Sequence, residues 1–256
     1  MDINLLVLNA GNSRLAIGVF SGGELIGVER ILNDQRDQWP AKIREAWGRI
    51  AEMESPAVVG ATVNPPLIEP LEHLVQEICG QEMQWVGRGI DFPIAVKVDE
   101  PKQVGVDRVL NVAAAYEQLG KACIVVDAGT AVTVDFCNDA GEFLGGAISP
   151  GVNLMLSSLH EKTARLPLVE FKTPEDLYGK NTASALCHGV YQSIRGLVRE
   201  ASENYASTLG TWPEVIATGG DAEALFKDWE LIHAISPDLT IYGIALAYTE
   251  HQIRNS

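Results

Sequence analysis

Two stretches of this chain resemble each other, and their spacing limits the possible folds more than any other feature of the sequence. AGNSRLAIGVF begins at Ala10 and AGTAVTVDF begins at Ala128, an offset of 118 residues in a chain of 256. Each stretch follows an apolar run and one polar residue, which is Asn9 in the first copy and Asp127 in the second. Each predicts a strand, a glycine-containing turn and a second strand. The repeat therefore predicts two related halves, with a ligand site in the cleft between them.

The rest of the pattern alternates apolar strands with amphipathic helices and predicts an α/β fold. With 46% hydrophobic residues, the chain can form two domains of ordinary size. We expect these domains at residues 1–115 and 116–256, each carrying one hairpin. Helices are expected over residues 36–54, 67–78, 105–120, 152–161, 181–206 and 237–253.

The charge balance narrows the range of partners. The chain carries 34 acidic and 19 basic residues, a net charge of −15, which argues against broad binding to nucleic acid or to an anionic membrane. Its four cysteines are scattered, without zinc-ligand spacing, and are expected to be reduced thiols. The first residues lack the basic start and longer apolar region of a secretory signal, and no stretch approaches the ~20 apolar residues of a membrane span. We therefore expect a cytoplasmic protein with no nucleic-acid or membrane partner.

Both hairpin turns are candidates for holding nucleotide phosphates. Small residues in such a turn expose successive backbone N–H groups, which bind phosphate oxygens without lysine. Because G-x-x-x-x-G-K-[ST] is absent and no G-x-G-x-x-G follows the first strand, the two hairpins are the remaining phosphate loops. The residues expected around the nucleotide are Asn9, Ala10, Gly11, Asn12, Ser13, Arg14, Gly129 and Thr130. Either turn alone also fits an ordinary tight hairpin.

The residue at each loop entrance bears on cation binding. Carboxylate oxygens suit hard cations, and a cation neutralises phosphate charge, so Asp127 is a candidate metal ligand. The amide of Asn9 meets this requirement only in part. The sequence therefore predicts that the second loop supplies most of the charge that balances an ion.

A third stretch, TGGDA at residues 218–222, lies between an apolar strand and a helix. Its two glycines, Gly219 and Gly220, would let a flat base or a ribose approach the backbone. The same residues also fit an N-capped helix with no ligand. Together with the two hairpins, the segment favours nucleotide binding.

Seven segments in the same order make the chain resemble the type III pantothenate kinases, members of the acetate kinase, sugar kinase, Hsp70 and actin superfamily. The segments are NAGNSR, GVDR, DAGTAVTVD, GGAISPGV, LHEKTARLP, GKNT and TGGDA. The resemblance implies two actin-like (ribonuclease H-like) halves with an interdomain nucleotide cleft. It also implies ATP-dependent phosphorylation of pantothenate, the first step of coenzyme A biosynthesis, by a homodimer that uses Mg²⁺ and a monovalent cation, K⁺ or NH₄⁺.

The resemblance assigns roles to individual residues as well. Asp107 matches the proton acceptor for the substrate hydroxyl, which phosphoryl transfer to an alcohol requires. Asp127 matches a ligand of the monovalent cation, and Thr182 matches a threonine that reaches pantothenate in the partner subunit. The expected substrate-binding residues are Gly105, Val106, Asp107, Arg108 and Thr182. Without the resemblance, Asp107 would be interpreted as a helix cap and Thr182 as part of an N-cap.

Two positions depart from the family pattern and leave three hypotheses open. Asn9 stands where the first phosphate loop has an acid, and Val98 stands where a tyrosine contacts the substrate. The first hypothesis is an active pantothenate kinase, and the second is a kinase of this fold that acts on another small hydroxylated acid. The third is a catalytically weakened binding or regulatory homologue. An enzyme is favoured because all the groups nearest to the transferred phosphoryl group in the family pattern are retained, namely Asp107, Arg108, Asp127, Thr130 and Thr182.

Overall fold

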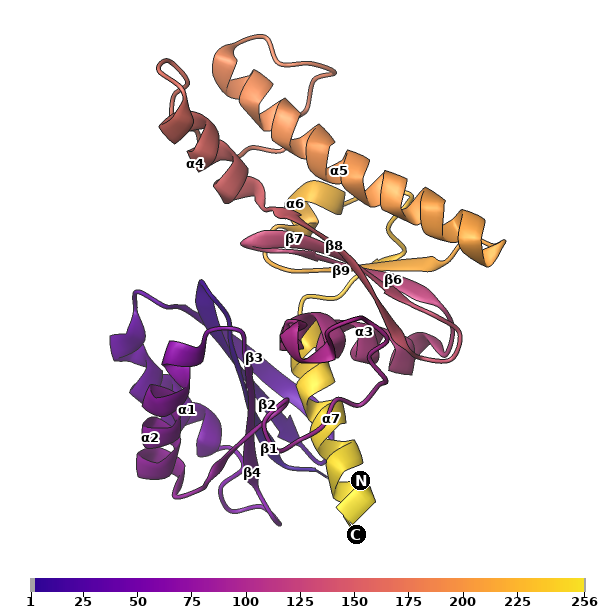
Figure 1. Cartoon of the computed structure of the whole chain (residues 1–256). Helices are drawn as coiled ribbons and strands as arrows, with labels where there is room; N and C mark the ends of the chain where they lie inside the picture. Colours follow the sequence, from indigo (N-terminus) through magenta and orange to yellow (C-terminus); the bar gives the residue numbers. More distant parts are fainter. Residues whose placement is uncertain (1–2, 256) are drawn as a thin grey trace. The chain divides into compact units, whose positions relative to one another are not determined.

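The computed structural model describes residues 3–255. They form two compact units, each with its own five-stranded sheet (Figure 1). The first unit comprises the chain up to Ala95, Asp99–Ala114 and the chain from Asp238 on. The second comprises Val96–Val98 and Ala115–Pro237, so that α3 (Val106–Leu119) contributes to both units.

The sheet of the first unit has the strand order β3-β2-β1-β4-β5. Its strands are β1 (Leu5–Ala10), β2 (Arg14–Ser21), β3 (Glu24–Leu32), β4 (Ala57–Thr62) and β5 (Met83–Trp85). β1, β2 and β3 form an antiparallel meander, and β4 and β5 run parallel to β1. Leu6 and Leu8 of β1 point to one face, and Leu5 and Val7 point to the other. All four are fully buried, so both faces of the sheet are covered.

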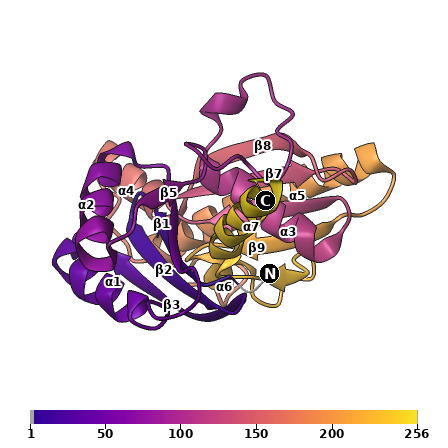
Figure 2. The same cartoon turned by 90° about the horizontal axis from the view of Figure 1, so that it is seen from below.

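Helices provide that cover. They are α1 (Trp39–Trp47), α2 (Ile68–Cys79) and α7 (Leu239–Asn255). α1 and α2 pack Ile43 and Leu71 against the face of Leu6 and Leu8. α7 lies on the opposite side of the strands, with Ile244 in the core (Figure 2).

The helix expected over residues 36–54 is shorter in the structure. Arg36–Gln38 forms a 3₁₀ turn, and α1 begins at Trp39. Pro40 fits the first turn of a helix because its missing N–H would have no intrahelical partner there. The helix ends at Trp47, immediately before Gly48, and the remaining residues form turns.

The sheet of the second unit repeats the topology of the first. Its strands are β6 (Cys123–Ala128), β7 (Ala131–Cys137), β8 (Phe143–Pro150), β9 (Glu214–Thr218) and β10 (Ala234–Ile235). Their order, β8-β7-β6-β9-β10, again places an antiparallel meander beside two parallel strands. β1 and β6 share even their burial pattern, in which only the fifth of six residues is half-buried. The prediction of two related halves is confirmed.

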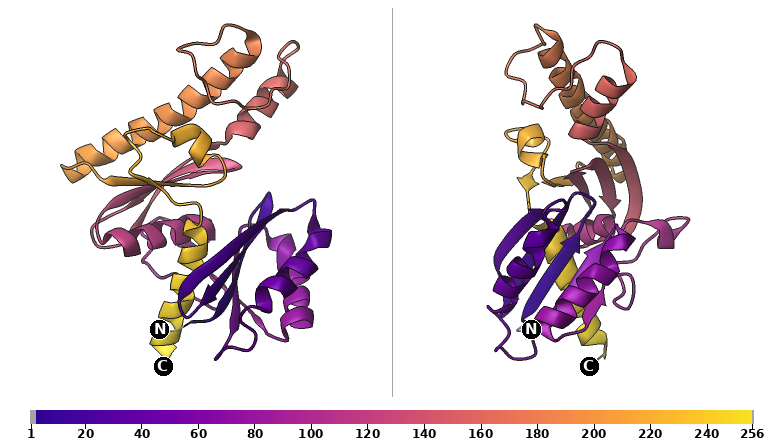
Figure 3. Two further views of the ribbon diagram at one scale, coloured as in Figure 1. Left: turned by 180° about the vertical axis from the view of Figure 1, so that it is seen from behind. Right: turned by 90° about the vertical axis from the view of Figure 1, so that its left-hand side faces the viewer.

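Three further helices belong to the second unit. They are α4 (Val152–Lys162), α5 (Thr182–Leu209) and α6 (Ala222–Phe226). α5 packs Val190, Ile194 and Val198 against Ile124 and Val126 of β6. α4 runs beside the first part of α5 (Figure 3). Within the described part of the chain, no helix combines the length and apolar character that a membrane span requires.

The C-terminal helix lies in the first unit, although the expected division at residue 115 placed it in the second. Gly243 makes a close approach possible, because a Cβ at this position would lie 2.3 Å from the carbonyl oxygen of Leu110. Beside it, the hydroxyl of Thr240 donates a hydrogen bond to Oδ1 of the buried Asn111 at 2.6 Å. α7 therefore packs closely against α3 at this turn.

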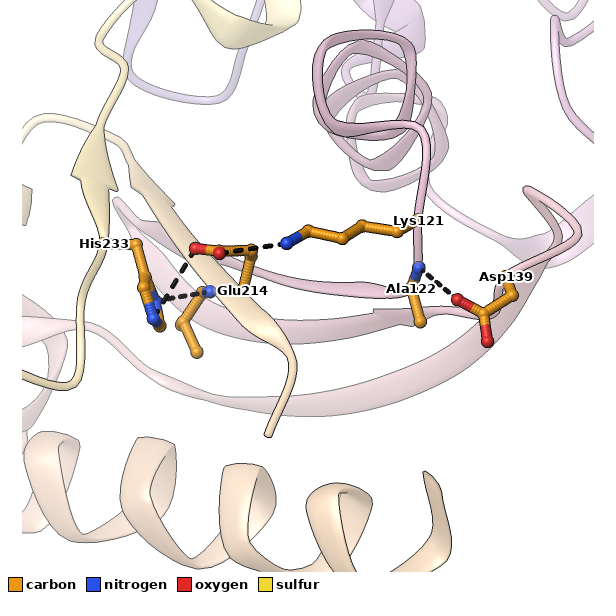
Figure 4. A network of polar contacts seen from close by, with 6 residues as sticks. Lys121, Ala122, Asp139, Glu214 and His233 are labelled. Atoms are coloured by element: carbon orange, nitrogen blue, oxygen red, sulfur yellow. Dashed lines mark hydrogen bonds and ion pairs between the residues drawn. The ribbon is translucent and has the colours of Figure 1, made fainter. Parts of the chain in front are cut away.

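A polar network ties the parallel strands of the second unit together where they begin (Figure 4). Glu214 on β9 pairs with Lys121 at 3.1 Å and with Nε2 of His233 at 3.5 Å. Nδ1 of His233 accepts a hydrogen bond from the backbone N–H of Val215 at 2.9 Å. In the neutral ring the proton is therefore on Nε2, facing Glu214. The network fixes the segment before β10 against β9.

Candidate active site

The first phosphate loop, which connects β1 to β2, is held by side chains from outside the hairpin. Nδ2 of Asn33 donates to the carbonyl oxygens of Gly11 and Asn12 at 3.0 and 2.9 Å. The hydroxyl of Thr62 donates to the carbonyl oxygen of Ala10 at 2.8 Å. These bonds fix the turn before any ligand binds, which lowers the entropic cost of binding.

The predicted residues of this loop differ in exposure. Asn12, Ser13 and Arg14 are exposed, whereas Asn9 is half-buried near the end of β1. The turn itself is closed by the N–H of Gly11, which donates to the carbonyl oxygen of Arg14 at 3.0 Å. The exposed polar tip of the hairpin fits a loop that holds phosphate oxygens.

The GVDR segment lies at the same edge of the sheet as this loop. β1 and β4 are parallel, so their carboxyl ends meet at one edge, where open α/β sheets bind ligands. Val63 directly follows β4, and its Cγ1 lies 3.8 Å from the position of a Cβ on Gly105. The first turn of α3, with Val106, Asp107 and Arg108, begins beside this contact. The structure thus brings the first phosphate loop and the GVDR segment together within one unit.

Asp107 is held in a way that differs from a helix cap. Its Oδ1 accepts the N–H of the adjacent Arg108 at 2.8 Å, whereas an N-cap accepts from residues two or three positions on. A Cβ on Gly105 would lie 2.8 Å from the same oxygen, so the glycine leaves room for the carboxylate. Burial raises the pKa of the Asp107 carboxyl, and the backbone N–H and guanidinium of Arg108 lower it in part. A carboxylate with a raised pKa is a better proton acceptor than an ordinary surface aspartate.

Glycines allow the backbone to pack closely around the second phosphate loop. Oδ1 of Asp127 lies 2.5 Å from the position of a Cβ on Gly219 and 3.6 Å from that of a Cβ on Gly129. Gly219 also has φ +95°, a conformation that favours glycine. A Cβ on Gly151 would lie 2.1 Å from the carbonyl oxygen of Gly129 and 2.6 Å from that of Thr130. The Asp127 carboxylate therefore occupies a cradle that side chains at the neighbouring positions would fill.

Backbone hydrogen bonds join the TGGDA segment to this loop. β6 and β9 are parallel, with Asp127 paired to Thr218, so Gly219 and the exposed Gly220 follow directly at the edge of the sheet. The N–H of Asp221 donates to the carbonyl oxygen of Ala128 at 2.9 Å. The structure therefore brings together the second hairpin and the segment predicted to approach a base or ribose.

The Asp127 carboxylate can hold a hard cation. Carboxylate oxygens are the kind of ligand that K⁺ or Mg²⁺ prefers. Among residues 3–255, no group of three or more His, Cys, Asp or Glu side chains is arranged to hold a metal ion. An ion at Asp127 would therefore take its other oxygen ligands from outside this set of side chains, for example from the phosphates of a bound nucleotide.

Thr182 and Val98 both belong to the second unit. Thr182 is the exposed first residue of α5, and the N-cap is its neighbour Asn181, which accepts the N–H of Ser184 at 2.9 Å. Val98 is half-buried, and its Cγ1 lies 3.4 Å from the position of a Cβ on Gly145 in β8. Neither position forms part of the cradle around Asp127.

Sequence reasoning missed two residues that shape the loops. Asn33 follows β3 and returns to the first hairpin, and its Oδ1 is buried without a hydrogen-bond partner among the described residues. Gly151 lies within the recognised segment GGAISPGV, but its contact with the second loop was not predicted. The sequence carried a signal only for the glycine, through the segment in which it lies. The structure explains the contact, because β8 pairs with β7 and ends beside the turn.

The duplicated sheets define an actin-like fold. MreB 5 of Spiroplasma citri, solved with AMPPNP, superposes with a TM-score of 0.51 at 11% identity over 100% of this chain and 99% of its own. A Baf family protein from Campylobacter jejuni superposes with a TM-score of 0.64 at 21% identity over 97% and 99%. A model of the type III pantothenate kinases matches residues 5–204. The type III pantothenate kinase of Solibacter usitatus is 33% identical over 250 residues, 95% of each chain. This chain belongs to the type III pantothenate kinase family.

Proposed function

We propose that this protein transfers the γ-phosphoryl group of ATP to the primary hydroxyl of pantothenate, giving 4'-phosphopantothenate in the first step of coenzyme A biosynthesis. The observation that carries the proposal is Asp107, a half-buried carboxylate with a raised pKa beside Arg108, at the sheet edge that also carries the first phosphate loop. We place the reaction in the cytoplasm.

Asp107 acts as the proton acceptor. As the pantothenate hydroxyl oxygen forms its bond to the γ-phosphorus, the bond between that phosphorus and the β–γ bridging oxygen breaks and ADP leaves. The hydroxyl proton passes to the Asp107 carboxylate. Arg108 offers a planar, charged donor suited to the substrate carboxylate or to a phosphate oxygen.

The two hairpins hold the phosphates in this proposal. The first loop, from Asn9 to Arg14, and the second, at Gly129 and Thr130, offer backbone N–H groups, while Gly219 and Gly220 leave space for the nucleoside. Mg²⁺ and K⁺ or NH₄⁺, when bound, neutralise phosphate charge. Asp127 is the residue that would hold the monovalent ion, since its carboxylate lies in the glycine cradle.

A homodimer completes the substrate site in this proposal, because Thr182 would contact pantothenate bound to the partner. Exposed apolar side chains around α4 and the start of α5 support an interface there. They are Leu154, Leu159, Leu168, Leu177 and Tyr178, of which Leu177 is 85% exposed. Burial of such a surface in a second copy would remove these side chains from water.

Identification of the product by mass spectrometry tests the proposal. Incubation with ATP, Mg²⁺, K⁺ and pantothenate should convert pantothenate into its phosphate ester, and Asp107→Asn should abolish most of the conversion. ADP formed without phosphorylated pantothenate would contradict the proposal.

A second candidate is a kinase for a related hydroxylated acid, which Val98 favours because the family has a tyrosine at this position. Under this alternative, a panel of small hydroxy acids would include a better acceptor than pantothenate. Val98→Tyr would then raise the rate with pantothenate relative to that acceptor.

A further inference from the structure

A cavity of about 340 Å³ on the second unit contains two arginines and two aromatic rings that the kinase reaction does not use. It is lined by Tyr191, Gln192, Arg195, Gly196, Arg199 and Trp229. Five of these residues come from the middle of α5, and Trp229 follows α6. None of them belongs to the phosphate loops, the GVDR segment or TGGDA.

Aromatic rings fix one of the guanidinium groups in place. The Cζ atom of Arg195 lies 4.2 Å from the ring centre of Trp229 and 4.8 Å from that of Tyr191. The guanidinium also donates a hydrogen bond to the Tyr191 hydroxyl. Trp229 is itself stacked on Phe226, with ring centres 5.9 Å apart. A guanidinium restrained by two rings can offer its remaining N–H groups to a planar oxyanion and loses little entropy on binding.

The second arginine adds a positive charge on the same helix face. The Cζ atom of Arg199 lies 5.8 Å from the ring centre of Trp229. Among the residues that the structure describes, no carboxylate forms an ion pair with Arg195 or Arg199. Such a pair of uncompensated cations is unusual in a chain whose net charge is −15.

A glycine keeps this part of the helix surface open. Gly196 lies between the two arginines in the sequence, and a Cβ there would meet no atom within 4 Å. Glycine weakens a helix interior, and no packing within the described structure requires it at this position. The missing side chain instead leaves room at the wall of the cavity for a molecule that approaches α5 from outside.

We propose that this cavity binds a small polyvalent oxyanion, a phosphate or carboxylate compound, through Arg195 and Arg199 over Trp229. The oxyanion accepts N–H hydrogen bonds from the stacked guanidinium of Arg195 and is attracted by the positive charge of Arg199. The site is separate from the nucleotide loops, and its occupancy does not depend on whether the chain phosphorylates pantothenate.

The Trp229 indole N–H provides a local probe in the full-length protein. Its ¹⁵N-labelled signal is identified by its loss in Trp229→Phe, and is followed during separate titrations with inorganic pyrophosphate and with citrate. A saturable change in its chemical shift with pyrophosphate assigns the site to phosphates, and a saturable change with citrate assigns it to carboxylates. Either result supports the proposal, since the shared chemistry is that of an oxyanion.

Variants decide whether the arginines bind the anion. Arg195→Gln with Arg199→Gln should raise the dissociation constant at this site by ~10-fold or more, because two charge-assisted contacts are lost. Arg44→Gln, which removes an exposed positive charge from α1, should leave it unchanged, and the other tryptophan signals report that each variant is folded. The proposal is overturned if neither anion moves the Trp229 signal or if the double variant responds like the parent. It is also overturned if the chemical shift of this signal depends on the protein concentration and not on the anion concentration, because a second copy would then cover the cavity.

Discussion

The two phosphate loops share one strand pairing but are stabilised in different ways. In the first unit, a neutral Asn9 precedes the turn, and the side chains of Asn33 and Thr62 hold its carbonyl groups. In the second unit, the charged Asp127 precedes the turn, and close backbone packing at Gly151 and Gly219 holds it. The same backbone shape is therefore reached by side-chain hydrogen bonds in one half and by the absence of side chains in the other.

The two units also differ in the charged side chains that lie near their loops. The first unit combines its loop with Asp107 and Arg108, which in the proposed reaction would accept the proton and bind an anionic group. The second unit combines its loop with a carboxylate that suits a cation. In the proposed reaction, Asp127 would supply the negative charge that Asn9 lacks.

The largest effect is expected at Asp107, the proposed proton acceptor in the first unit. Asp107→Asn should lower kcat by ~10²-fold or more with nucleotide affinity almost unchanged, as measured by steady-state kinetics and ADP titration. Asp91→Asn, an exposed site in the same unit, is the control and should retain full activity. A kcat within a few-fold of the parent would remove Asp107 from the mechanism.

Asp107 also gives a pH dependence with a definite sign. Because burial raises its pKa, the carboxylate is protonated as the pH falls through a value above that of an ordinary aspartate, and activity is lost there. The raised pKa also means that the ionised form lowers the free energy of unfolding at neutral pH. Asp107→Asn should therefore keep or raise the melting temperature at neutral pH while activity falls. A lower melting temperature would contradict this explanation.

A pair of glycine substitutions compares how the two loops are supported. Gly219→Ala should lower the free energy of unfolding by about 2 kcal/mol, because its φ is positive and its Cβ would lie 2.4 Å from the carbonyl oxygen of Ala128. Gly11→Ala places its Cβ at an ordinary 3.4 Å from the Arg14 carbonyl oxygen and should leave stability unchanged or raise it by up to about 1 kcal/mol. Urea unfolding measures both variants. Equal losses would show that the two turns are supported alike.

Removal of the negative charge from the second loop should weaken binding of the monovalent cation. Asp127→Asn should lower the rate at moderate K⁺ by ~10-fold and shift the K⁺ activation curve to higher concentration, since an amide binds a hard cation less well than a carboxylate. Rates measured across a K⁺ series, at constant ionic strength, test this expectation. An unchanged activation curve would place the monovalent ion elsewhere.

The smallest effect is expected from addition of the charge that the first loop lacks. Asn9→Asp should change the rate by less than about 3-fold, which corresponds to a change of less than ~0.7 kcal/mol in the activation free energy. The double variant with Asp127→Asn should remain as slow as Asp127→Asn alone. A gain of tenfold or more from Asn9→Asp would show that the first loop limits the ion site.

Much of this arrangement could be predicted from the sequence, because it depends on local pattern. Apolar alternation and a glycine turn predict each hairpin, and their repeat at Ala10 and Ala128 predicts the duplicated sheets. The pattern of the C-terminal helix showed an apolar face but not which sheet it covers, since that depends on the space left at Gly243. Asn33 was missed for a similar reason: an asparagine in a turn carries no sign of the loop to which it hydrogen-bonds.

The most direct measurement is coupled ADP release with ATP and Mg²⁺, with and without pantothenate, in K⁺ and then with Na⁺ in its place. We expect ADP release that requires pantothenate and is much faster in K⁺ than in Na⁺. Bound ATP with no pantothenate-dependent turnover in either salt would contradict it.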